Sequence, residues 1–304
     1  MSKFNKVTVI VSSCLVVAGV LISIAGYIRG GALSYNIDFS RGFGHWYQQS
    51  HDRAVDKYEL LSDERDIEGI DIDVEAGDVN ITADSTVSNV SVSTNIPSEN
   101  IQAEIDSEGI LTVKDLRTEE NYEGLNFDFG GFADDEYVTI VVPEETLDTL
   151  SVNVKYGDIN ISSVSAKEET VSQDCGDFTA DSCTVGSGNI ENNCGDFTAD
   201  SCTVGSGNIE NNCGDIRFNN SSVSLDKVTS DLGDIRFESC SILTDMAIES
   251  SCGDVDIVDT VNKCVYKADT DCGDVNLGGY DDSDSDASTP VVTADLSMGD
   301  FNVD

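Results

Sequence analysis

Positive charge is scarce in this sequence. Lys and Arg together number 16 among 304 residues, against 58 Asp and Glu, and only 2 His occur. All 58 acidic residues lie beyond residue 37, whereas 13 basic residues lie beyond Arg29, which gives the part after Arg29 a formal charge of −45. Binding to phosphate requires the opposite sign, so nucleic acid and an anionic membrane surface are excluded as partners. Divalent cations, basic peptides and neutral glycans remain compatible with this charge.

The sequence also lacks the residue sets of common metal and catalytic sites. No Cys-x-x-Cys pair occurs, and His45 and His51 have no Cys between them, so a zinc-thiolate site is not expected. The stretch 175–212 contains no Lys, Arg or His, although a polysaccharide lyase on a β-helix needs a basic residue beside its acidic groups. Hydrolysis by paired carboxylates stays open, but Asp is so frequent that such pairs are expected by chance.

A block of 19 residues is repeated without a single difference. The sequence CGDFTADSCTVGSGNIENN fills 175–193 and again 194–212. Gly-Asp steps keep nearly the same period over a longer range, at Gly157, Gly176, Gly195, Gly214, Gly233, Gly253, Gly273 and Gly299. A fixed period of this size is typical of a solenoid, in which each repeat is one coil stacked on the next. A copied coil presents the same groups twice, whereas an enzyme needs one asymmetric set, so we expect no catalytic site.

Apolar residues follow each Gly-Asp step with period two. The residues two and four positions after each Gly are apolar, whereas the residue between them is mostly polar. This alternation predicts a short strand with one face inside. Two further short strands are expected around Val185 and Ile190 and around their equivalents in the next coils. The predicted fold class is therefore all-β: a parallel β-solenoid, similar to a β-helix, with 19–20 residues per coil and one N-terminal transmembrane helix. Parallel coiling of this kind favours a right-handed winding, although a coil this short also fits other windings.

The N-terminal part differs from the repeats. Residues 7–28 form a run of 22 without charge, which is long enough to cross a bilayer as a helix. Lys3 and Lys6 precede this run, so the positive-inside rule places the N-terminus in the cytoplasm and everything after residue 29 outside. We therefore expect a single-pass cell-membrane protein with an extracellular C-terminal domain. A cleaved signal peptide is the alternative, because Ser23-Ile24-Ala25 resembles a cleavage site.

Composition divides the chain into four parts. Residues 30–66 have mixed polarity and are expected to form a juxtamembrane stalk, with a short helix around 50–61. Apolar alternation begins at Ile67 and is interrupted by an irregular acidic stretch over 96–136 that contains one clear strand, 110–113. The predicted parts are 1–29 (cytoplasmic tip and transmembrane anchor), 30–66 (stalk), 67–146 (first β coil with an acidic insert) and 147–304 (Gly-Asp repeat β-solenoid).

Stacked coils would place Asp residues in a column of like charge. The column consists of Asp177, Asp196, Asp215 and Asp234. Neighbours about 5 Å apart repel by about 0.8 kcal/mol in water and several-fold more at a half-buried surface. Either the carboxylates accept backbone N–H bonds in the turn, as Asp commonly does, or they share Ca²⁺, a cation that prefers oxygen ligands. Both interpretations stay open, and no other cofactor is predicted.

Cysteines form columns as well. Ten are present, of which Cys14 falls in the apolar N-terminal run, and the odd number that remains leaves at least one free or paired with another molecule. One column, Cys175, Cys194, Cys213, Cys252 and Cys272, precedes the Gly, and a second consists of Cys183, Cys202 and Cys240. A stacking distance of about 4.8 Å permits a disulfide, so bridges between adjacent coils are predicted, with Cys175, Cys194, Cys183, Cys202, Cys252 and Cys272 as candidates. A reduced stack that packs as small apolar side chains is the alternative.

The distal end of the stack is predicted to be a point of contact. Asp304 directly follows the strand 301–303, so the last coil would present unpaired N–H and C=O groups. Strand addition by a partner, or end-to-end self-association of two copies, is expected there. The acidic insert 281–290 beside the final coil would oppose self-association by charge repulsion.

Three segments resemble a known protein family. They are IDIDVEAGDVNI at 70–81, VTIVVPEE at 138–145 and LSVNVKYGDINI at 150–161, and the serial coils then continue to Val303. With the single apolar N-terminal run, they resemble the bacterial putative-adhesin family, a domain of unknown function built from β-strand repeats that includes LiaG-like envelope proteins. Family coils commonly have Ser before the Gly-Asp step, whereas this chain has Cys.

The resemblance implies a surface protein of the cell envelope, of Gram-positive type, without a catalytic residue. The predicted function is a non-catalytic, membrane-anchored module that contacts an unknown envelope protein or a glycan, with the membrane engaged through residues 7–28. One alternative is an envelope-stress accessory protein that acts through its membrane segment. A less favoured one is a carbohydrate-active β-helix enzyme.

Overall fold

The computed structural model describes residues 34–37, 46–47, 56–117, 125–128, 136–144, 146–278 and 287–304, and the regular elements of these residues are strands. The all-β prediction is confirmed for this part of the chain. The transmembrane helix expected over 7–28 lies outside the described residues, and among those described no helix has the length and hydropathy to cross a bilayer. The chain divides into two compact units, one of residues 1–54 and 117–134 and the other of residues 55–116 and 135–304.

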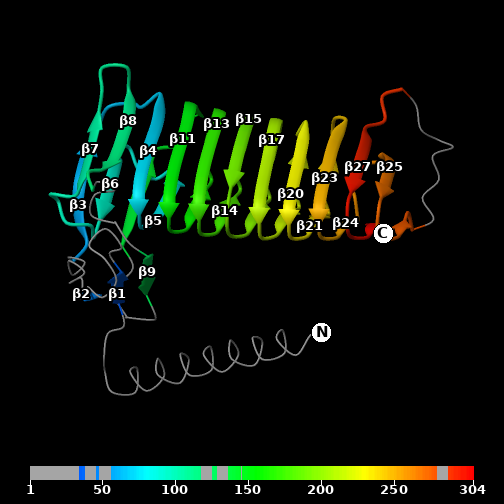
Figure 1. Cartoon of the computed structure of the whole chain (residues 1–304). Helices are drawn as coiled ribbons and strands as arrows, with labels where there is room; N and C mark the ends of the chain where they lie inside the picture. The colour runs from blue at the N-terminus through cyan, green and yellow to red at the C-terminus, as the bar shows by residue number, and fades with distance from the viewer. Residues whose placement is uncertain are drawn as a thin grey trace, which may run out of the picture. The chain divides into compact units, whose positions relative to one another are not determined.

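The first unit contains a three-stranded antiparallel sheet. Its strands are β1 (Ser34–Ile37), β2 (Trp46–Tyr47) and β9 (Leu125–Asp128), in the order β2-β1-β9 (Figure 1). Tyr35 pairs with Phe127 in this sheet. The sheet thus joins a segment that precedes the repeats to the acidic excursion, although the two are far apart in the sequence.

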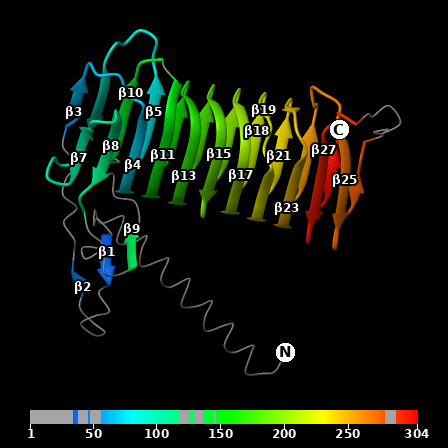
Figure 2. The same cartoon turned by 90° about the horizontal axis from the view of Figure 1, so that it is seen from above.

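The second unit is a stack of coils with two main strands each (Figures 1 and 2). In a typical coil the chain runs along the long strand β13 (Ser165–Cys175), turns at Gly176, returns along the short strand β14 (Phe178–Asp181) and turns again at Ser182. Long strands of successive coils pair in parallel in one sheet, and short strands pair in parallel in another. We call these the long-strand sheet and the short-strand sheet. The parallel stacking predicted from the repeat is confirmed.

The strands of each sheet come from all parts of the unit. The long-strand sheet contains β4 (Gly69–Ala76), β7 (Ile101–Ile105), β8 (Ile110–Asp115), β11 (Thr146–Tyr156), β13, β15 (Thr184–Asn192), β17 (Thr203–Cys213), β20 (Lys227–Leu232), β23 (Met246–Cys252), β25 (Val265–Thr270) and β27 (Val291–Leu296). Their order is β25-β27-β23-β20-β17-β15-β13-β11-β4-β8-β7, and the short strands β19 (Ser222–Val223) and β22 (Ser241–Ile242) continue from β17.

The short-strand sheet is built in the same way. It contains β3 (Tyr58–Asp63), β5 (Asp78–Ala83), β6 (Val90–Thr94), β10 (Tyr137–Val142), β12 (Ile159–Ser162), β14, β16 (Phe197–Asp200), β18 (Ile216–Asn219), β21 (Ile235–Glu238), β24 (Val255–Val258), β26 (Val275–Asn276) and β28 (Phe301–Val303). Their order is β26-β28-β24-β21-β18-β16-β14-β12-β5-β10-β6-β3. Each Gly-Asp corner therefore lies between the two sheets, at one side of the stack.

The core lies between the two sheets. On β14, Phe178 and Ala180 are buried and Thr179 is partly exposed, as period two requires. The apolar residues two positions after each Gly are buried in every coil except the outermost one, where Val275 is 42% exposed. The predicted inward face of the repeat is thus confirmed, and the exception marks the end of the stack.

Aromatic rings stack along the core. Phe178 and Phe197, in the duplicated coils, have ring centroids 5.2 Å apart, and Phe218 and Phe237 in the next two coils have centroids 4.9 Å apart. The order Phe-x-Ala in the duplicated coils becomes Ile-x-Phe in the following ones, so one large side chain is kept in each coil. One phenylalanine therefore lies in the core of each of these coils, and the later coils add an isoleucine where the duplicated ones have only an alanine beside it.

The long strands differ from the prediction in part of the stack. The prediction of two separate short strands around Val185 and Ile190 is wrong for the duplicated coils, where β15 and β17 are single strands of 9 and 11 residues. From residue 222 on, β19 and β20 are separate. Leu225 is fully buried between them, whereas its equivalent Ser206 is exposed. The break between β19 and β20 therefore coincides with an additional buried apolar side chain.

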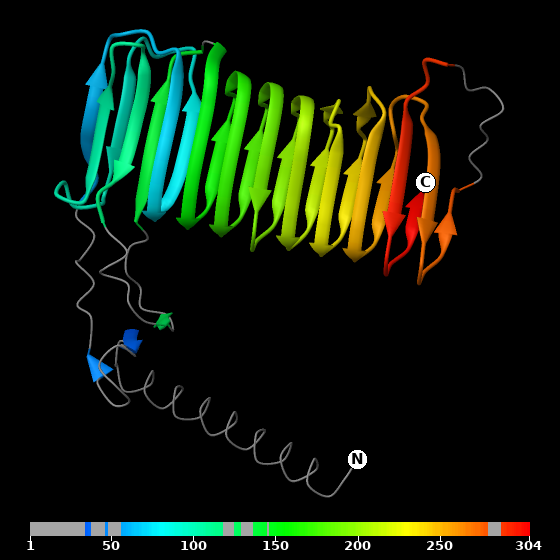
Figure 3. The ribbon, with the colours of Figure 1, turned by 45° about the horizontal axis from the view of Figure 1, so that its top comes forward.

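The last coil in the sequence is not the last coil in space (Figure 3). β27 lies between β23 and β25, and β28 lies between β24 and β26. The expected sequential order of coils is wrong here, and so is the expectation that strand 301–303 forms the distal edge. That edge is formed by β25 and β26 instead. Strand addition or self-association at the distal end stays a prediction, and it now concerns these two strands.

Burial explains this order. The coil of β27 and β28 buries Val292, Ala294, Leu296, Phe301 and Val303, whereas β26 has no buried side chain. A coil inside the stack is covered on both sides, so the more apolar coil gains more free energy from the inner position. On the edge strand β25, exposed charges from Lys267 and Asp269 disfavour pairing with another chain.

At the opposite end, the acidic stretch 96–136 adds β7 and β8 to the long-strand sheet, and β3, β6 and β10 from either side of it in the sequence extend the short-strand sheet. β8 pairs in parallel with β4 and β10 pairs in parallel with β5, so they form a coil outside the first Gly-Asp coil. The antiparallel strands β7, β6 and β3 continue the sheets at this end. β8 confirms the strand expected at 110–113. The helix expected around 50–61 is wrong at residues 58–61, because β3 occupies them and Leu60 and Leu61 pack against the core.

Deletion of residues 194–212 should remove one coil and leave the others folded. Residues of β15 pair with residues 19 positions later in β17, so the shortened chain keeps all registers. Coil and interface terms add approximately in repeat proteins, so we expect the same far-UV circular dichroism shape with a melting temperature lower by a few degrees. Deletion of 194–202 alone breaks the register and should unfold the stack. An unfolded product of the 194–212 deletion would contradict the register.

Candidate functional site

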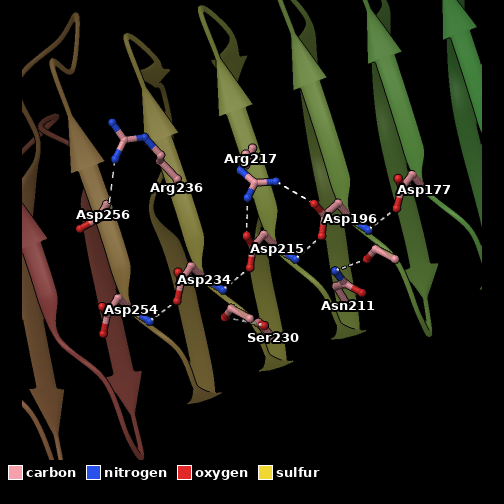
Figure 4. Close-up of polar contacts among 12 residues, drawn as sticks. Asp177, Asp196, Asn211, Asp215, Arg217, Ser230, Asp234, Arg236, Asp254 and Asp256 are labelled. Carbon is pink, nitrogen blue, oxygen red and sulfur yellow. Dashed lines mark hydrogen bonds and ion pairs between the residues drawn. The ribbon is translucent and has the colours of Figure 1, made fainter. Parts of the chain in front are cut away.

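A chain of hydrogen bonds connects the Asp residues of the corners from coil to coil (Figure 4). The N–H of Asp196 donates to Asp177 Oδ1, and the N–H of Asp215 donates to Asp196 Oδ1, both at 2.9 Å. In spatial order this Asp ladder comprises Asp78, Asp158, Asp177, Asp196, Asp215, Asp234, Asp254, Asp300 and Asp274. One carboxylate oxygen of each inner member thus accepts a backbone N–H, which is the first of the two interpretations left open by the sequence.

Glycine precedes each Asp because the corners stack too closely for a side chain. Gly195 has a φ of +139°, which residues with a Cβ rarely adopt, and a Cβ there would lie 1.9 Å from the carbonyl oxygen of Gly176. The Gly195 N–H donates to the carbonyl of Cys213 in the next coil at 2.8 Å. The glycine therefore brings consecutive corners close enough for the Asp carboxylate to reach the next N–H.

One guanidinium neutralises part of the Asp ladder. Arg217 on β18 donates to Asp196 Oδ2 at 2.9 Å and also to Asp215 Oδ2 (Figure 4). The N–H of Asp215, followed by Arg217, holds the pKa of the Asp196 carboxyl below its ordinary value. Arg236, one coil further, instead pairs with Glu238 and Asp256. Arg217 thus pairs with two consecutive members of the ladder, whereas Arg236 does not bind the ladder member of its own coil, Asp234.

Ca²⁺ binding by the predicted column of Asp177, Asp196, Asp215 and Asp234 stays a prediction. Oδ1 of all four accepts a backbone N–H, and Oδ2 of Asp196 and Asp215 binds Arg217. Within the described residues, no three His, Cys, Asp or Glu side chains are arranged to hold a metal ion. A shared cation would therefore have to compete with Arg217 at the central step.

Buried polar side chains hold the corners from inside, a feature that the sequence analysis missed. Gln173 Nε2 donates to the Gly157 carbonyl at 2.7 Å, and Asn211 Nδ2 donates to the Gly195 carbonyl at 3.0 Å. Asn192, Ser230, Ser250 and Thr270 make the equivalent contact in other coils. Gln173 Oε1, Asn192 Oδ1 and Asn211 Oδ1 are buried without a hydrogen-bond partner, which is destabilising. The signal was a polar residue two positions before the Cys column.

The first cysteine column lies along the outside of the corners. In spatial order its members are Tyr156, Cys175, Cys194, Cys213, Leu232, Cys252, Met298 and Cys272. Cys252 and Cys272 were expected to be adjacent, and this is wrong because Met298 of the last coil lies between them. Cys175 and Cys194 are adjacent, and a bridge between them stays a prediction. Burial, together with the neighbouring Cys194, raises the pKa of the Cys175 thiol.

The second cysteine column lies in the core. The N–H of Cys183 donates to Cys202 Sγ at 3.4 Å, and both thiols donate to backbone carbonyls. A hydrogen bond between the Cys183 and Cys202 thiols lowers the pKa of the Cys202 thiol. Ser221 lies between Cys202 and Cys240, so these two are not adjacent. A Cys183–Cys202 bridge stays a prediction, as does the alternative of a packed, reduced pair.

A carboxyl group lies inside the core. Glu169 on β13 is 7% exposed and pairs in register with Leu150 on one side and Gly188 on the other. Burial raises the pKa of Glu169 to about 7, and the nearby Cys202 contributes to this. Glu169 was not predicted as an inward residue, although it lies two positions before the inward Val171 and so shares its phase. Gly188 leaves space above it that an apolar side chain occupies at Leu150.

A polar groove lies over the short-strand sheet near its β3 end. It has a volume of about 440 Å³ and is lined by Lys57, Tyr58, Glu59, Ser91, Ser93, Thr139 and Val141. The Tyr58 hydroxyl donates to the Ile96 carbonyl at 2.7 Å, which fixes the ring in the wall. Hydroxyl groups both donate and accept hydrogen bonds, so the lining suits a neutral polar ligand.

The second unit is therefore a protein of parallel, two-sheet coils joined at Gly-Asp corners. A family model described as Toastrack DUF4097 matches residues 67–303, and the chain belongs to this family. The resemblance to the putative-adhesin family seen in the sequence is confirmed.

Three solved structures are distantly similar to this chain. A "putative cell adhesion protein" from Clostridium sporogenes is 13% identical, covers 82% of this chain and 98% of its own, and has a TM-score of 0.32. A "putative adhesin" from Bacteroides fragilis is 11% identical with the same coverages and a TM-score of 0.35. A "putative lipid binding protein" from Parabacteroides distasonis is 13% identical, covers 81% and 96%, and has a TM-score of 0.45. No curated protein sequence matches the chain.

Two substitutions of Asp177 should separate its hydrogen bond from its charge. Asp177→Asn keeps an oxygen that can accept the Asp196 N–H, so we expect little change in the free energy of unfolding. Asp177→Ala removes that acceptor at an exposed corner and should cost about 0.5–1.5 kcal/mol. Urea unfolding of both variants measures the difference. Equal losses would show that the Asp ladder acts through charge rather than through its hydrogen bonds.

Calcium should raise the melting temperature if the predicted column binds it. Binding to the folded state alone stabilises that state by mass action. Replacement of Asp177, Asp196 and Asp215 by Asn should remove the increment, because the charge is lost. The side-chain oxygen of Asn can still accept the backbone N–H of the next coil. Differential scanning calorimetry with calcium and with chelator checks this. A melting temperature that is indifferent to calcium would leave hydrogen bonding as the function of the column.

Glu169 should make the stack less stable as the pH rises. Its pKa is raised from 4.5 to about 7 on folding, so its contribution is complete below pH 4.5 and is lost as the pH passes 7. Between pH 5 and pH 8 we expect a loss of about 2–3 kcal/mol that Glu169→Gln abolishes. The exposed neighbour provides the control, because Glu168→Gln should keep the loss. The measurement is the free energy of unfolding at both pH values. An equal fall between pH 5 and pH 8 in wild type and in Glu169→Gln would contradict this assignment.

Proposed function

We propose that this protein is a non-catalytic surface module of the cell envelope, anchored in the membrane through residues 7–28, whose coils contact an envelope protein or a glycan. The uncharged run of 22 residues and the basic residues before it support the anchor. Membership of the Toastrack DUF4097 family supports the assignment of the coils to a module of this kind.

The observation that carries this proposal is the structural use of the repeated polar groups. Each inner Asp of the Asp ladder directs Oδ1 to the N–H of the next coil, and Gln173 or its equivalents bind the glycine carbonyls from inside. These groups hold coil on coil: the Asp recurs in successive coils, and the inner donor is Gln, Asn, Ser or Thr. What varies from coil to coil is the outer surface, and a long surface of this kind suits contact with a partner better than it suits a reaction centre.

The polar groove supports a glycan as one class of partner. Its serine and threonine hydroxyls on β6 and β10 face the same space as Tyr58. Sugars bind through hydrogen bonds to hydroxyl groups and through contact of a ring face with an aromatic side chain. A neutral glycan is also compatible with the strongly negative charge of the chain.

Surface display and glycan contact can be tested separately on the full chain in a Gram-positive host. External protease should remove a C-terminal epitope from intact cells, and a variant without residues 1–29 should lose membrane association. Displaying cells should then bind purified cell-wall glycan. Ser93→Asp with Thr139→Asp in the groove should reduce this binding, whereas Thr198→Asp on the outer face of β16 should not.

Each result favours a different function. Protection from external protease would overturn the surface location. Display without glycan binding would favour a protein partner. If removal of 1–29 also abolished a stress response of the cell, the alternative of an envelope-stress accessory acting through the membrane segment would be favoured. Turnover of the glycan by purified protein would overturn the non-catalytic assignment.

A further inference from the structure

Apolar and thiol side chains form a continuous ridge along the Gly-Asp corners, in which Cys213 and Cys252 are partly exposed and the other members are exposed. We call it the corner ridge, and it consists of Tyr156, Cys175, Cys194, Cys213, Leu232, Cys252, Met298 and Cys272. Tyr156 is 58% exposed, Leu232 54% and Met298 52%, and Cys175, Cys194 and Cys272 are exposed as well. Seven steps of about 4.8 Å make the ridge about 34 Å long. Apolar residues scattered singly on a surface need no explanation, whereas a continuous apolar stripe indicates an interaction site.

The corner itself does not require apolar side chains on its outside. The opposite corner of each coil carries polar residues: Ser163, Ser182, Ser201, Asn220, Ser239 and Asp259. The conformation of the Gly-Asp corner is set by the glycine and by the Asp hydrogen bond, and neither involves the side chain before the glycine. The apolar character of the corner ridge therefore has no role in forming the turn that we can identify.

Negative charge lies along one side of the corner ridge and at three steps on the other side. The Asp ladder lies two residues after each ridge member, and Asp174, Asp231 and Asp271 directly precede Cys175, Leu232 and Cys272. The residues that precede the other members are Asn or Ser, with Lys155 before Tyr156. Arg217 shows how a cation fits here, because its guanidinium reaches Oδ2 of two consecutive ladder members. The chain supplies such a guanidinium at one step of the Asp ladder, between Asp196 and Asp215.

We propose that the corner ridge docks a basic amphipathic helix of a partner protein. An apolar stripe of the helix would lie on the ridge, and Lys or Arg on both sides of the stripe would reach the flanking carboxylates. A helix advances 5.4 Å per turn, close to the coil spacing of about 4.8 Å, so each turn meets about one coil. A second copy of this chain is disfavoured as the occupant, because both copies carry the same strong negative charge.

The proposal names a partner for the surface module and rests on the proposed function only in that the ridge must be accessible. The test uses the full chain in nanodiscs of zwitterionic lipid, with empty nanodiscs as the blank. The probe is a fluorescent Leu/Lys peptide of about 22 residues, whose helix spans the ridge and carries one apolar stripe. A scrambled peptide of the same composition controls for charge alone. Fluorescence anisotropy at low and high salt measures affinity.

The variants change exposed residues alone, which keeps the stack folded. Tyr156→Ser, Leu232→Ser and Met298→Ser together remove the large side chains of the ridge. Leu243→Ser with Val261→Ser is the matched control, since these residues are 53% and 71% exposed but lie off the ridge. We expect the peptide to bind the wild type and the control equally and the ridge variant at least about tenfold more weakly, with weaker binding at high salt.

Three results would overturn the proposal. They are absence of binding to the wild-type chain, equal binding of the scrambled peptide, and equal affinity of the ridge variant and wild type. Because the measurement uses purified protein, it does not depend on surface display or glycan binding in cells. A failure of the proposed function would therefore appear in the protease and glycan experiments and not here.

Discussion

The stack depends on one interaction, the hydrogen bond from the backbone N–H of each corner Asp to Oδ1 of the corner Asp in the adjacent coil. It recurs at 2.8–2.9 Å from Asp78 to Asp274, and it requires that consecutive corners approach within the distance at which a Cβ would collide with the neighbouring carbonyl. Glycine and aspartate are therefore needed together: the first permits the approach and the second uses it. The parallel pairing of both sheets follows, because each corner sets the register of the strand on either side of it.

This arrangement also explains how a column of like charges is tolerated. A carboxylate that accepts an N–H has part of its charge compensated by the backbone, and at one step Arg217 compensates two carboxylates at once. The remaining charge is directed outward along the corners. There it borders the corner ridge, so the geometry that stabilises the turns also gives the outer surface its alternation of apolar and acidic columns. Structure and surface chemistry thus have one origin, the repetition of a single corner.

The inward face of the stack carries polar groups that cost stability. Glu169 places a carboxyl in a column that Leu150 fills with an apolar side chain, and the amides of Gln173, Asn192 and Asn211 each leave an oxygen unpaired. These groups cost stability. The coils on both sides bury mainly apolar side chains, and this burial supplies the free energy that holds the less favourable coils in place.

Local pattern was sufficient for the repeating part. Period two after each Gly-Asp step fixes which residues face inward, and an exact 19-residue repeat fixes the register, because both depend on neighbours within one coil. The Asp column could be located in the same way, but the choice between hydrogen bonding and cation binding could not be made, since it depends on whether the next N–H comes within reach. The inward position of Glu169 could be predicted from the sequence, because it lies two residues before the inward Val171.

The order of coils was decided by the tertiary structure alone. In the sequence, the coil of 291–303 follows the coil of 265–276. In the stack, the coil of 291–303 lies further from the end than the coil of 265–276, and the strands of the acidic excursion lie beyond the first Gly-Asp coil. A repeat pattern states which coils can stack but not which neighbours they choose, because every coil offers the same two sheet edges. The choice is made by burial: the coil with the more complete apolar face takes the inner position, and the separation of Cys252 from Cys272 by Met298 is a consequence of it.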